Sequence, residues 1–247
     1  MTKKTSKYIL SYGGGVNSSA LFFYLLEKKL PLDIVVFSDT GEESEDTMQS
    51  VRSMQKICKI KNIPFVTVQS HHGNLYDYYY SKKTVMSMMK RDCTGKFKVA
   101  PIRKYLRDTF GKDTNFVMYI GIAWDEALRV RDSNVKYITN SYPFVEDKIT
   151  RKGNDDILKK YNFFAIKSGC KGCMYNKRKN WIKMLIEDPK EFKRHMILEE
   201  NNMRYPSILL NGQYSLRSLY ESYKNQTTLT GFNDLEPSCD VSGSCFL

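Results

Sequence analysis

Two of the six cysteines stand in a C-x-x-C arrangement, Cys170-Lys171-Gly172-Cys173. Thiolates are soft ligands, so a pair at this spacing suits an iron–sulfur cluster or Zn²⁺, and a lone pair can equally be redox-active. In a cytoplasmic chain of this size, such cysteines are more typical of metal ligands or redox thiols than of a disulfide framework. The spacing by itself leaves these chemistries open.

A glycine-rich loop near the start of the chain is the second candidate site. It reads Ser11-Tyr12-Gly13-Gly14-Gly15-Val16-Asn17-Ser18-Ser19 and joins an apolar run to a helical pattern. Glycines allow a tight turn whose N–H groups point inward, and the helix that follows adds its positive end, so the loop suits a phosphate. No Gly-Lys-Ser/Thr closes the loop, so it is not a Walker motif. The alternative is a capped strand-to-helix turn without a ligand.

The elements around these residues alternate between strand and helix. Bounded apolar runs predict strands at 7–11, 34–38, 65–68 and 116–120, and helical periodicity follows Val16 and covers 44–59 and 102–106. Strands separated by helix-length segments predict an α/β fold, a Rossmann-like parallel sheet flanked by helices, with ligands at the carboxyl ends of the strands. Residues 132–160 are charged and are expected to be rich in loops.

Polar loops follow the second and fourth expected strands as well. The second strand runs into Asp39-Thr40-Gly41, and the fourth runs into a segment from Gly121 to Arg129 that includes Asp125. Because the carboxyl ends of parallel strands meet at one edge of a sheet, these loops and the glycine loop are expected to converge there.

The composition indicates a globular protein of 247 residues with a formal net charge of +12. That charge favours partners dense in negative charge, such as nucleic acid or nucleotides. The Lys-rich start has no apolar leader, and no apolar run approaches the roughly 20 residues that span a bilayer, so we expect a cytoplasmic protein without a membrane partner. We expect a nucleotide-binding α/β domain over residues 1–165 and a basic helical C-terminal region over 166–247, with an irregular tail from 227.

Five segments in order resemble the ATP pyrophosphatase (PP-loop) superfamily, in particular its phosphoadenosine phosphosulfate reductase-like branch. They are YGGGVNSSA, VVFSDTGEESEDT, RDCTGKFKVAPIRKYL, GIAWDEALR and GCKGCMYNKRKNWIKML, and together they run from about Lys7 to Glu200. Five ordered matches are more specific than any one of them.

The resemblance implies that the glycine loop grips the phosphates of ATP, with Mg²⁺, and that a substrate oxygen attacks the α-phosphorus before sulfur displaces AMP. It implies catalytic roles for Asn17, Asp39, Lys98 and Arg129. The nucleotide-binding residues that it implies are Ser11, Tyr12, Gly13, Gly14, Gly15, Asn17, Ser18, Ser19, Asp39, Thr40, Gly41, Gly121, Asp125 and Arg129. Cations are needed around the phosphates, and Lys98, Arg103 and Arg129 are the candidates.

The loop departs from the family pattern at two positions. Gly13 stands where the family usually has Ser, and Asn17 stands where adenylating members generally have Asp. Asn keeps a hydrogen-bonding tip but lacks the negative charge that helps to hold Mg²⁺.

Within the resemblance, Cys93 joins Cys170 and Cys173 as a third metal ligand, and the family context favours a [4Fe-4S] cluster. Cluster-bearing sulfonucleotide reductases have a Cys-Cys pair where this chain has Cys93-Thr94. Either Cys239 or Cys245 supplies a fourth thiolate, or one iron stays open to hold a hydrosulfide. A purely structural cluster is the alternative. Cys58, on the apolar face of an expected helix, is interpreted as a core thiol.

Two basic stretches, 82–104 and 167–183, surround these cysteines, and Tyr175 and Trp181 lie within the second. Such a surface suits phosphate backbones and stacked bases.

The leading hypothesis is an ATP-dependent enzyme that adenylates an oxygen of DNA or tRNA for sulfur transfer, giving a phosphorothioate or a thionucleoside. Its expected partner is a cysteine desulfurase or another sulfur donor. The alternatives are an adenylyl-sulfate or phosphoadenylyl-sulfate reductase and a non-catalytic nucleotide- or nucleic-acid-binding subunit. A homodimer is compatible with the sequence.

Overall fold

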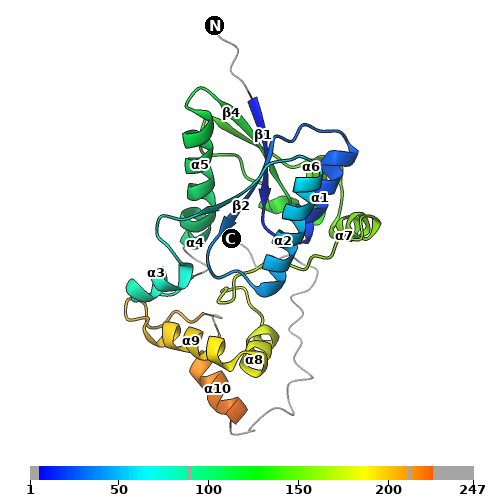
Figure 1. Ribbon diagram of the computed structural model, residues 1–247. Helices are drawn as coiled ribbons and strands as arrows, with labels where there is room; N and C mark the ends of the chain where they lie inside the picture. The colour runs from blue at the N-terminus through cyan, green and yellow to red at the C-terminus, as the bar shows by residue number, and fades with distance from the viewer. Residues whose placement is uncertain (1–5, 88–90, 211–212, 225–247) are drawn as a thin grey trace. The chain divides into compact units, whose positions relative to one another are not determined.

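A computed structural model describes residues 6–87, 91–210 and 213–224 (Figure 1). Its contacts divide the chain into two compact units. The first comprises Met1–Leu75 and Cys93–Lys171, and the second comprises Tyr76–Asp92 and Gly172–Leu247. The division in the C-terminal half thus falls just before Gly172, inside the C-x-x-C motif. No helix among the described residues is both long enough and apolar enough to cross a membrane.

The first unit is built on a five-stranded sheet in which every paired strand is parallel. The strands are β1 (Ser6–Tyr12), β2 (Ile34–Asp39), β3 (Phe65–Gln69), β4 (Asn115–Ile120) and β5 (Ile138–Ser141), in the order β3-β2-β1-β4-β5. The chain builds outward from β1 to β3 and then returns to place β4 on the other side of β1. Ligands of such sheets bind where the order reverses, at the carboxyl ends of β1 and β4. The expected Rossmann-like parallel sheet is confirmed.

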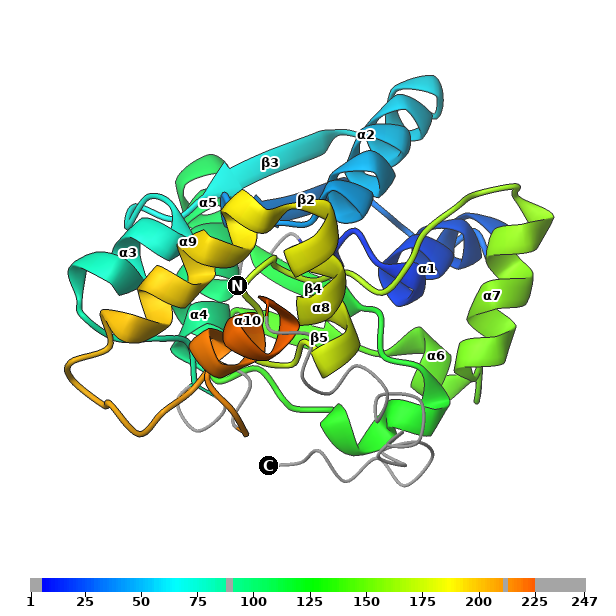
Figure 2. The ribbon, with the colours of Figure 1, turned by 90° about the horizontal axis from the view of Figure 1, so that it is seen from below.

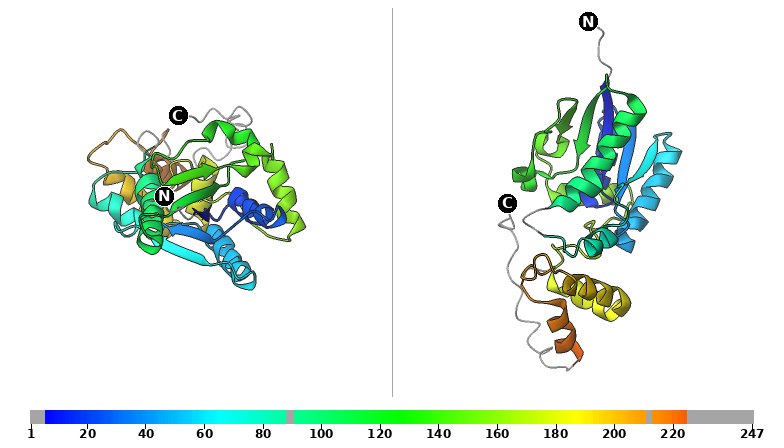
Figure 3. Two further views of the ribbon diagram at one scale, coloured as in Figure 1. Left: turned by 90° about the horizontal axis from the view of Figure 1, so that it is seen from above. Right: turned by 90° about the vertical axis from the view of Figure 1, so that its left-hand side faces the viewer.

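Helices cover both faces of this sheet (Figures 1 and 3). On one face, α1 (Val16–Glu27), α2 (Glu45–Ile60), α6 (Pro143–Glu146) and α7 (Arg151–Lys160) share a core that includes Leu10, Phe22 and Met54. On the other face, α5 (Ala100–Phe110) buries Ile102 and Leu106 against Ile9 and neighbouring strand residues. The strands therefore alternate their side chains between two apolar layers, which explains their nearly continuous hydrophobic runs.

The expectation of a loop-rich segment at 132–160 is wrong, because this segment forms β5, α6 and α7. The helix α7 has a charged sequence, RKGNDDILKK, in which only Asn154 and Leu158 are buried. These two residues lie four apart and so share one helix face, which packs against α1 (Figure 2). Thr150 caps the helix by accepting a hydrogen bond from the Gly153 amide. The apolar stripe is too narrow for a periodicity argument, and tertiary packing stabilises the helix.

Shorter elements complete the first unit. The chain leaves α4 (Asp92–Thr94) through a π-helical segment, η1 (Gly95–Val99), directly into α5, and a 3₁₀ helix, η2 (Trp124–Arg129), follows β4. The hydroxyl of Ser38 donates to the Phe97 carbonyl at 2.6 Å, and that of Ser70 donates to the Lys96 carbonyl at 2.9 Å. These bonds fasten η1 to the carboxyl ends of β2 and β3.

The second unit is helical over most of its described residues. It contains α8 (Arg178–Glu187), α9 (Pro189–Glu200), α10 (Leu216–Lys224) and nearly all of α3 (Leu75–Ser81), and α9 packs against both α8 and α10 (Figure 3). Its core centres on Trp181 and Phe192, whose rings pack edge to face. The expected helical region through Glu200 is present. The tail from residue 227 lies outside the described residues.

Candidate functional site

The glycine loop spans the gap between the end of β1 and the first turn of α1. Gly14 has a φ of +73°, which favours glycine, and a Cβ at Gly15 would lie only 2.7 Å from the Ser168 hydroxyl oxygen. The helix begins at Val16. Its N-cap residue, Gly15, offers no side-chain cap, and its first turn has no acidic residue. The first-turn amides of a helix have no intrahelical acceptor, so this end of α1 offers several N–H donors to an anion.

Hydroxyl groups hold the loop in this shape. The Ser18 hydroxyl accepts from the Gly13 amide and donates to the Gly15 carbonyl, each at 3.2 Å. Beneath the loop, the Tyr12 hydroxyl lies 3.0 Å from the Ser19 hydroxyl, and both residues are buried. Burial raises the pKa of Tyr12 to about 12. The side chains of Tyr12 and Ser19 therefore support the loop from the core.

The end of β4 packs directly against the start of α1. A Cβ at Gly121 would lie 2.8 Å from the Asn17 carbonyl carbon, so the strand end approaches as closely as glycine permits. The Asn17 side chain donates to Glu126 at 2.7 Å and accepts from Asn154 at 3.0 Å. The expected convergence of the loops after β1 and β4 is thus present, and it is bridged by Asn17.

Glu126 lies at the centre of a charged group on η2 and α7. Both Arg129 and Arg151 pair with its Oε1 atom, Arg151 at 2.6 Å. Burial of Glu126 favours the neutral form, but the hydrogen bond from Arg151 and the charge of Arg129 outweigh it and lower the pKa of Glu126. Asp125 accepts from the Arg151 amide at 3.0 Å.

The loop after β2 carries a second polar group. The Asp39 carboxylate accepts from the Gly41 amide at 2.8 Å and from the Gln69 side chain at 3.3 Å, which fixes its orientation at the strand end. Glu43, whose side chain is fully buried, accepts from the Thr40 hydroxyl at 3.1 Å and pairs with Lys98 at 3.1 Å. This ion pair joins the loop after β2 to η1.

Cys170 belongs to the same group. Its Sγ atom lies 3.5 Å from the Thr40 hydroxyl oxygen and 3.7 Å from Glu43 Oε1. The backbone around it pairs with the loop after β2: the Ser44 amide donates to the Gly169 carbonyl at 3.0 Å, and the Lys171 amide donates to the Glu42 backbone carbonyl at 2.8 Å. Since Ser168 also contacts the glycine loop, residues 168–170 link the expected phosphate site to the first cysteine of the C-x-x-C motif.

The remaining predicted ligands are placed as follows. Cys93 is half-buried in α4, immediately before η1, and Cys173 is half-buried in the second unit. Cys239 and Cys245 lie outside the described residues. Cysteine thiolates are the ligand type that iron–sulfur clusters and Zn²⁺ prefer, so the residue types at these positions suit either group. Cys58 is fully buried and its pKa is raised to about 12 by burial, which agrees with a core thiol.

The side chain of Arg103, one of the candidate cations, donates to Asn134 at 2.7 Å. Trp181 was expected to contribute to a base-stacking surface, but this is wrong because its ring is fully buried in the second unit, against Phe192 and His195. Tyr175 remains 38% exposed.

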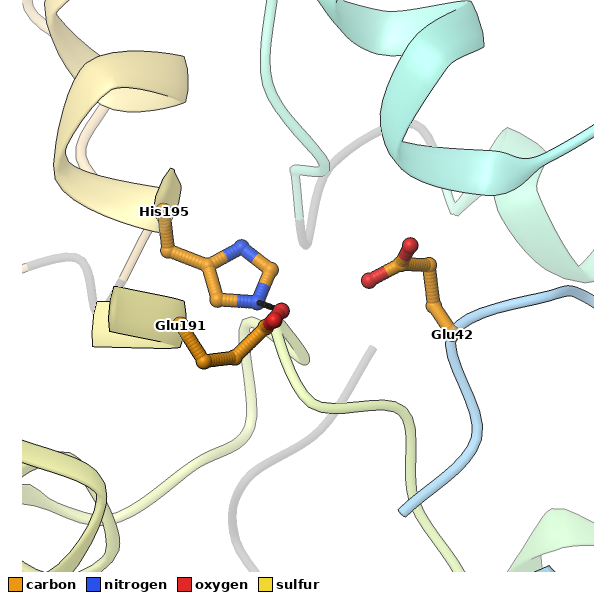
Figure 4. A group of neighbouring side chains, drawn as sticks. All are labelled: Glu42, Glu191 and His195. Atoms are coloured by element: carbon orange, nitrogen blue, oxygen red, sulfur yellow. Dashed lines mark ion pairs between the residues drawn. The ribbon is translucent and has the colours of Figure 1, made fainter. Parts of the chain in front are cut away.

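A buried polar pair also lies in the second unit. His195 is 1% exposed, and its Nε2 atom lies 3.1 Å from the Glu191 carboxylate (Figure 4). A Cβ at Gly172 would lie 2.6 Å from the His195 ring, so the glycine of the C-x-x-C motif packs directly on this histidine. His195 is thus buried within the second unit, where it pairs with Glu191.

Sequence reasoning missed Glu43, Glu126, Arg151, Asn154 and Ser168. Glu43 and Glu126 stand within segments that resemble the family, next to residues that were selected, so the motifs contained a signal for both. Arg151, Asn154 and Ser168 come from segments without a motif, and only their contacts reveal them.

The glycine loop at the switch point of a parallel sheet, with polar loops after β2 and β4, defines a doubly wound, Rossmann-like α/β domain. Residues 7–139 match the family model of the phosphoadenosine phosphosulfate reductase domain, and the chain belongs to this family. The match includes Cys93 and Lys98, whereas Arg151, Asn154 and Cys170 lie beyond it.

Individual relatives are distant. The uncharacterized nin region protein ORF290 of Escherichia phage lambda is 28% identical over 169 residues, which cover 57% of this chain and 57% of that protein. The chain thus spans little more than half of this relative. A phosphoadenylyl-sulfate reductase from Candida auris shares 13% identity at a TM-score of 0.47, covering 66% of this chain and 76% of that one. The U34-tRNA thiolase NcsA from Methanococcus maripaludis was solved with its [4Fe-4S] cluster. It shares 14% sequence identity with this chain at a TM-score of 0.48, and the match covers 86% of this chain and 76% of that one.

Proposed function

We propose that this protein is a PP-loop enzyme that uses ATP to adenylate an oxygen of a nucleic acid and then replaces that oxygen with sulfur. One observation carries the proposal: residues 168–170 contact the glycine loop at one end and present the Cys170 thiol beside Glu43 and Thr40 at the other. A sulfur atom therefore lies at the same edge of the sheet as the candidate phosphate site.

The chain's own groups have distinct roles in this chemistry. The amides of the glycine loop bind the phosphates, and Lys98 and Arg129 supply positive charge while pyrophosphate leaves the α-phosphorus. The substrate then carries an oxygen-linked AMP, and a hydrosulfide displaces AMP together with that oxygen. The displacement itself is redox-neutral. Where a cysteine desulfurase is the donor, a thiol reductant first releases the hydrosulfide from its persulfide and is itself oxidised to a disulfide.

In this proposal Cys170 takes part in the sulfur step. Its thiol donates toward Glu43 Oε1, the oxygen that Lys98 holds, so Glu43 is positioned to accept the thiol proton. Cys93, Cys170 and Cys173 would hold a [4Fe-4S] cluster, which would supply an iron site for binding sulfur.

The second unit has surface groups that suit nucleic acid. Among the described residues of this unit, guanidinium groups lie over tyrosine rings in four places, with Arg91 over Tyr175 at 5.7 Å and Arg178 over Tyr214 at 5.0 Å as examples. Arginine beside aromatic rings favours phosphate backbones and stacked bases. With the net charge of +12, this supports DNA or tRNA as the substrate.

Reduction of an adenylyl sulfate is the second candidate. The matched family is named for that chemistry, and Asn17 replaces the acidic residue that adenylating members have at this position. In this case the nucleotide would occupy the same loop, and a thiol would attack sulfur.

The deciding experiment incubates anaerobically purified protein with ATP and either tRNA or DNA and measures pyrophosphate. Nucleic-acid-dependent release supports the proposal, whereas thiol-dependent sulfite release from adenylyl sulfate, without pyrophosphate, would favour the second candidate. Cys170→Ser should bleach absorption near about 400 nm that arises from iron–sulfur charge transfer. Cys58→Ser is the matched control and should leave this absorption unchanged.

A further inference from the structure

The side-chain oxygens of Asn17 and Glu126 are all engaged by other groups and leave no open ligand for a metal ion. Magnesium prefers several oxygen ligands in octahedral geometry, usually including a carboxylate. Here Asn17 Oδ1 faces the amide of Asn154, which is fully buried. Both oxygens of Glu126 are also engaged, Oε2 by Asn17 and Oε1 by the guanidinium groups of Arg129 and Arg151. A divalent cation held by residue 17 does not fit these groups.

The orientation of the Asn17 amide follows from its partners. An ionised carboxylate only accepts hydrogen bonds, so the nitrogen of Asn17 must face Glu126 and its oxygen must face the Asn154 nitrogen. An aspartate at position 17 would place a carboxylate oxygen where Nδ2 now lies, 2.7 Å from Glu126 Oε2. The asparagine is therefore the residue type that this pairing requires.

The two arginines are available to a ligand. Arg129 and Arg151 side chains are 53% and 61% exposed, and each uses only part of its five N–H donors on Glu126. Through Glu126 and Asn17 they are joined to the first turn of α1, whose amides have no intrahelical acceptor. Guanidinium groups bind phosphate oxygens in pairs, and the positive end of α1 reinforces that attraction.

We infer that Arg129 and Arg151 neutralise the phosphates of the bound nucleotide at this corner of the loop, in place of a divalent cation held by residue 17. The inference rests on the proposed nucleotide site and adds Arg151, from a segment outside the family match, as a phosphate-binding residue. Asn154 and Asn17 are positioning residues, since they orient the Glu126 carboxylate that holds both guanidinium groups.

The first test measures ATP binding to the full chain by calorimetry, in EDTA and in Mg²⁺. We expect wild type to bind ATP in EDTA, and Arg151→Ala to weaken binding about tenfold or more, as expected for loss of a charged hydrogen-bond donor. Lys152→Ala, an exposed neighbour on the same helix turn, is the matched control and should leave affinity unchanged. Equal affinity of Arg151→Ala and wild type would overturn the inference.

A double variant excludes an indirect effect, because Arg151→Ala also leaves Glu126 less neutralised. If Glu126→Gln restores wild-type affinity to Arg151→Ala, then Arg151 acts only on Glu126 and the inference is wrong. If the double variant still binds ATP weakly, Arg151 binds phosphate directly. A protein that binds no ATP under any condition contradicts the proposed function itself.

The second test does not depend on nucleotide. Asn17→Asp places two carboxylates together, so its melting temperature without nucleotide should fall in EDTA and recover in Mg²⁺, whereas wild type should not respond to Mg²⁺. Asn62→Asp, in an exposed turn, controls for the added charge. A Mg²⁺-dependent rise in the wild-type melting temperature that Asn17→Ala abolishes would show that residue 17 holds a cation, against the inference.

Discussion

Replacement of Gly15 by alanine isolates the contact that links the glycine loop to the cysteine segment. Gly15 has a φ of −106° and a ψ of 175°, a conformation that alanine adopts freely, so the backbone imposes no strain. The added methyl would, however, lie 2.7 Å from the Ser168 hydroxyl oxygen and 2.9 Å from the Ser168 backbone nitrogen. The second contact involves backbone, and a side-chain rotation cannot relieve it.

The loss in the free energy of unfolding on Gly15→Ala follows from these two contacts. Overpacking in a closely packed site typically costs about 1–3 kcal/mol. A value of about 2 kcal/mol lowers the melting temperature of a domain of this size by about 4–8 °C. Gly13→Ala is the matched control in the same loop, because its Cβ would lie 3.8 Å from Ser168 Oγ, an ordinary contact distance. We expect Gly13→Ala to melt close to wild type.

Thermal unfolding followed by circular dichroism measures the difference between the two variants. Ser168→Gly removes the hydroxyl and Cβ contacts but not the backbone contact. It should therefore restore part of the stability that Gly15→Ala loses. A double-mutant cycle gives the coupling free energy between residues 15 and 168. Equal melting temperatures for Gly15→Ala and Gly13→Ala would refute the close packing of residues 168–170 on the loop, and with it the link between the phosphate site and Cys170.

Three further predictions concern charge and thiol reactivity. Lys98→Ala should slow pyrophosphate release by about 100-fold or more, because a positive group near the phosphates is lost, whereas the exposed Lys104→Ala should not; equal rates would contradict the role of Lys98. Cys58, with its pKa raised to about 12, should resist alkylation at pH 8.5 in the native protein, and peptide mass mapping would show it labelled only after unfolding. The pKa of Glu126 is lowered from 4.5 in the folded state, so its contribution to stability is present above pH 4.5 and is lost as the pH falls below it. Urea midpoints of wild type should therefore drop more steeply on acidification than those of Glu126→Gln, and parallel curves would contradict this.

The amino-acid sequence by itself determined the first four strands, the glycine loop and the helices α1 and α2. These elements have strong local signals: continuous apolar runs in buried strands, helical periodicity after Val16, and Ser44 as the cap of α2. Because parallel strands bring their carboxyl ends to one edge, their order along the chain also indicated where Asp39 and Gly121 would lie. Three of the five segments that carry the family resemblance, YGGGVNSSA, VVFSDTGEESEDT and GIAWDEALR, lie within or directly after these elements.

Only the tertiary structure decided the rest. The edge strand β5 and the helix α7 are too short or too charged to show a pattern, and they form because β5 pairs with β4 and α7 packs on α1. The contacts of Asn17 with Glu126 and Asn154 join residues more than a hundred positions apart, as does the approach of Cys170 to Glu43. Nothing local encodes such pairs, since they arise from how separate loops close over the sheet, and this closure brings the thiol and the guanidinium groups to the glycine loop.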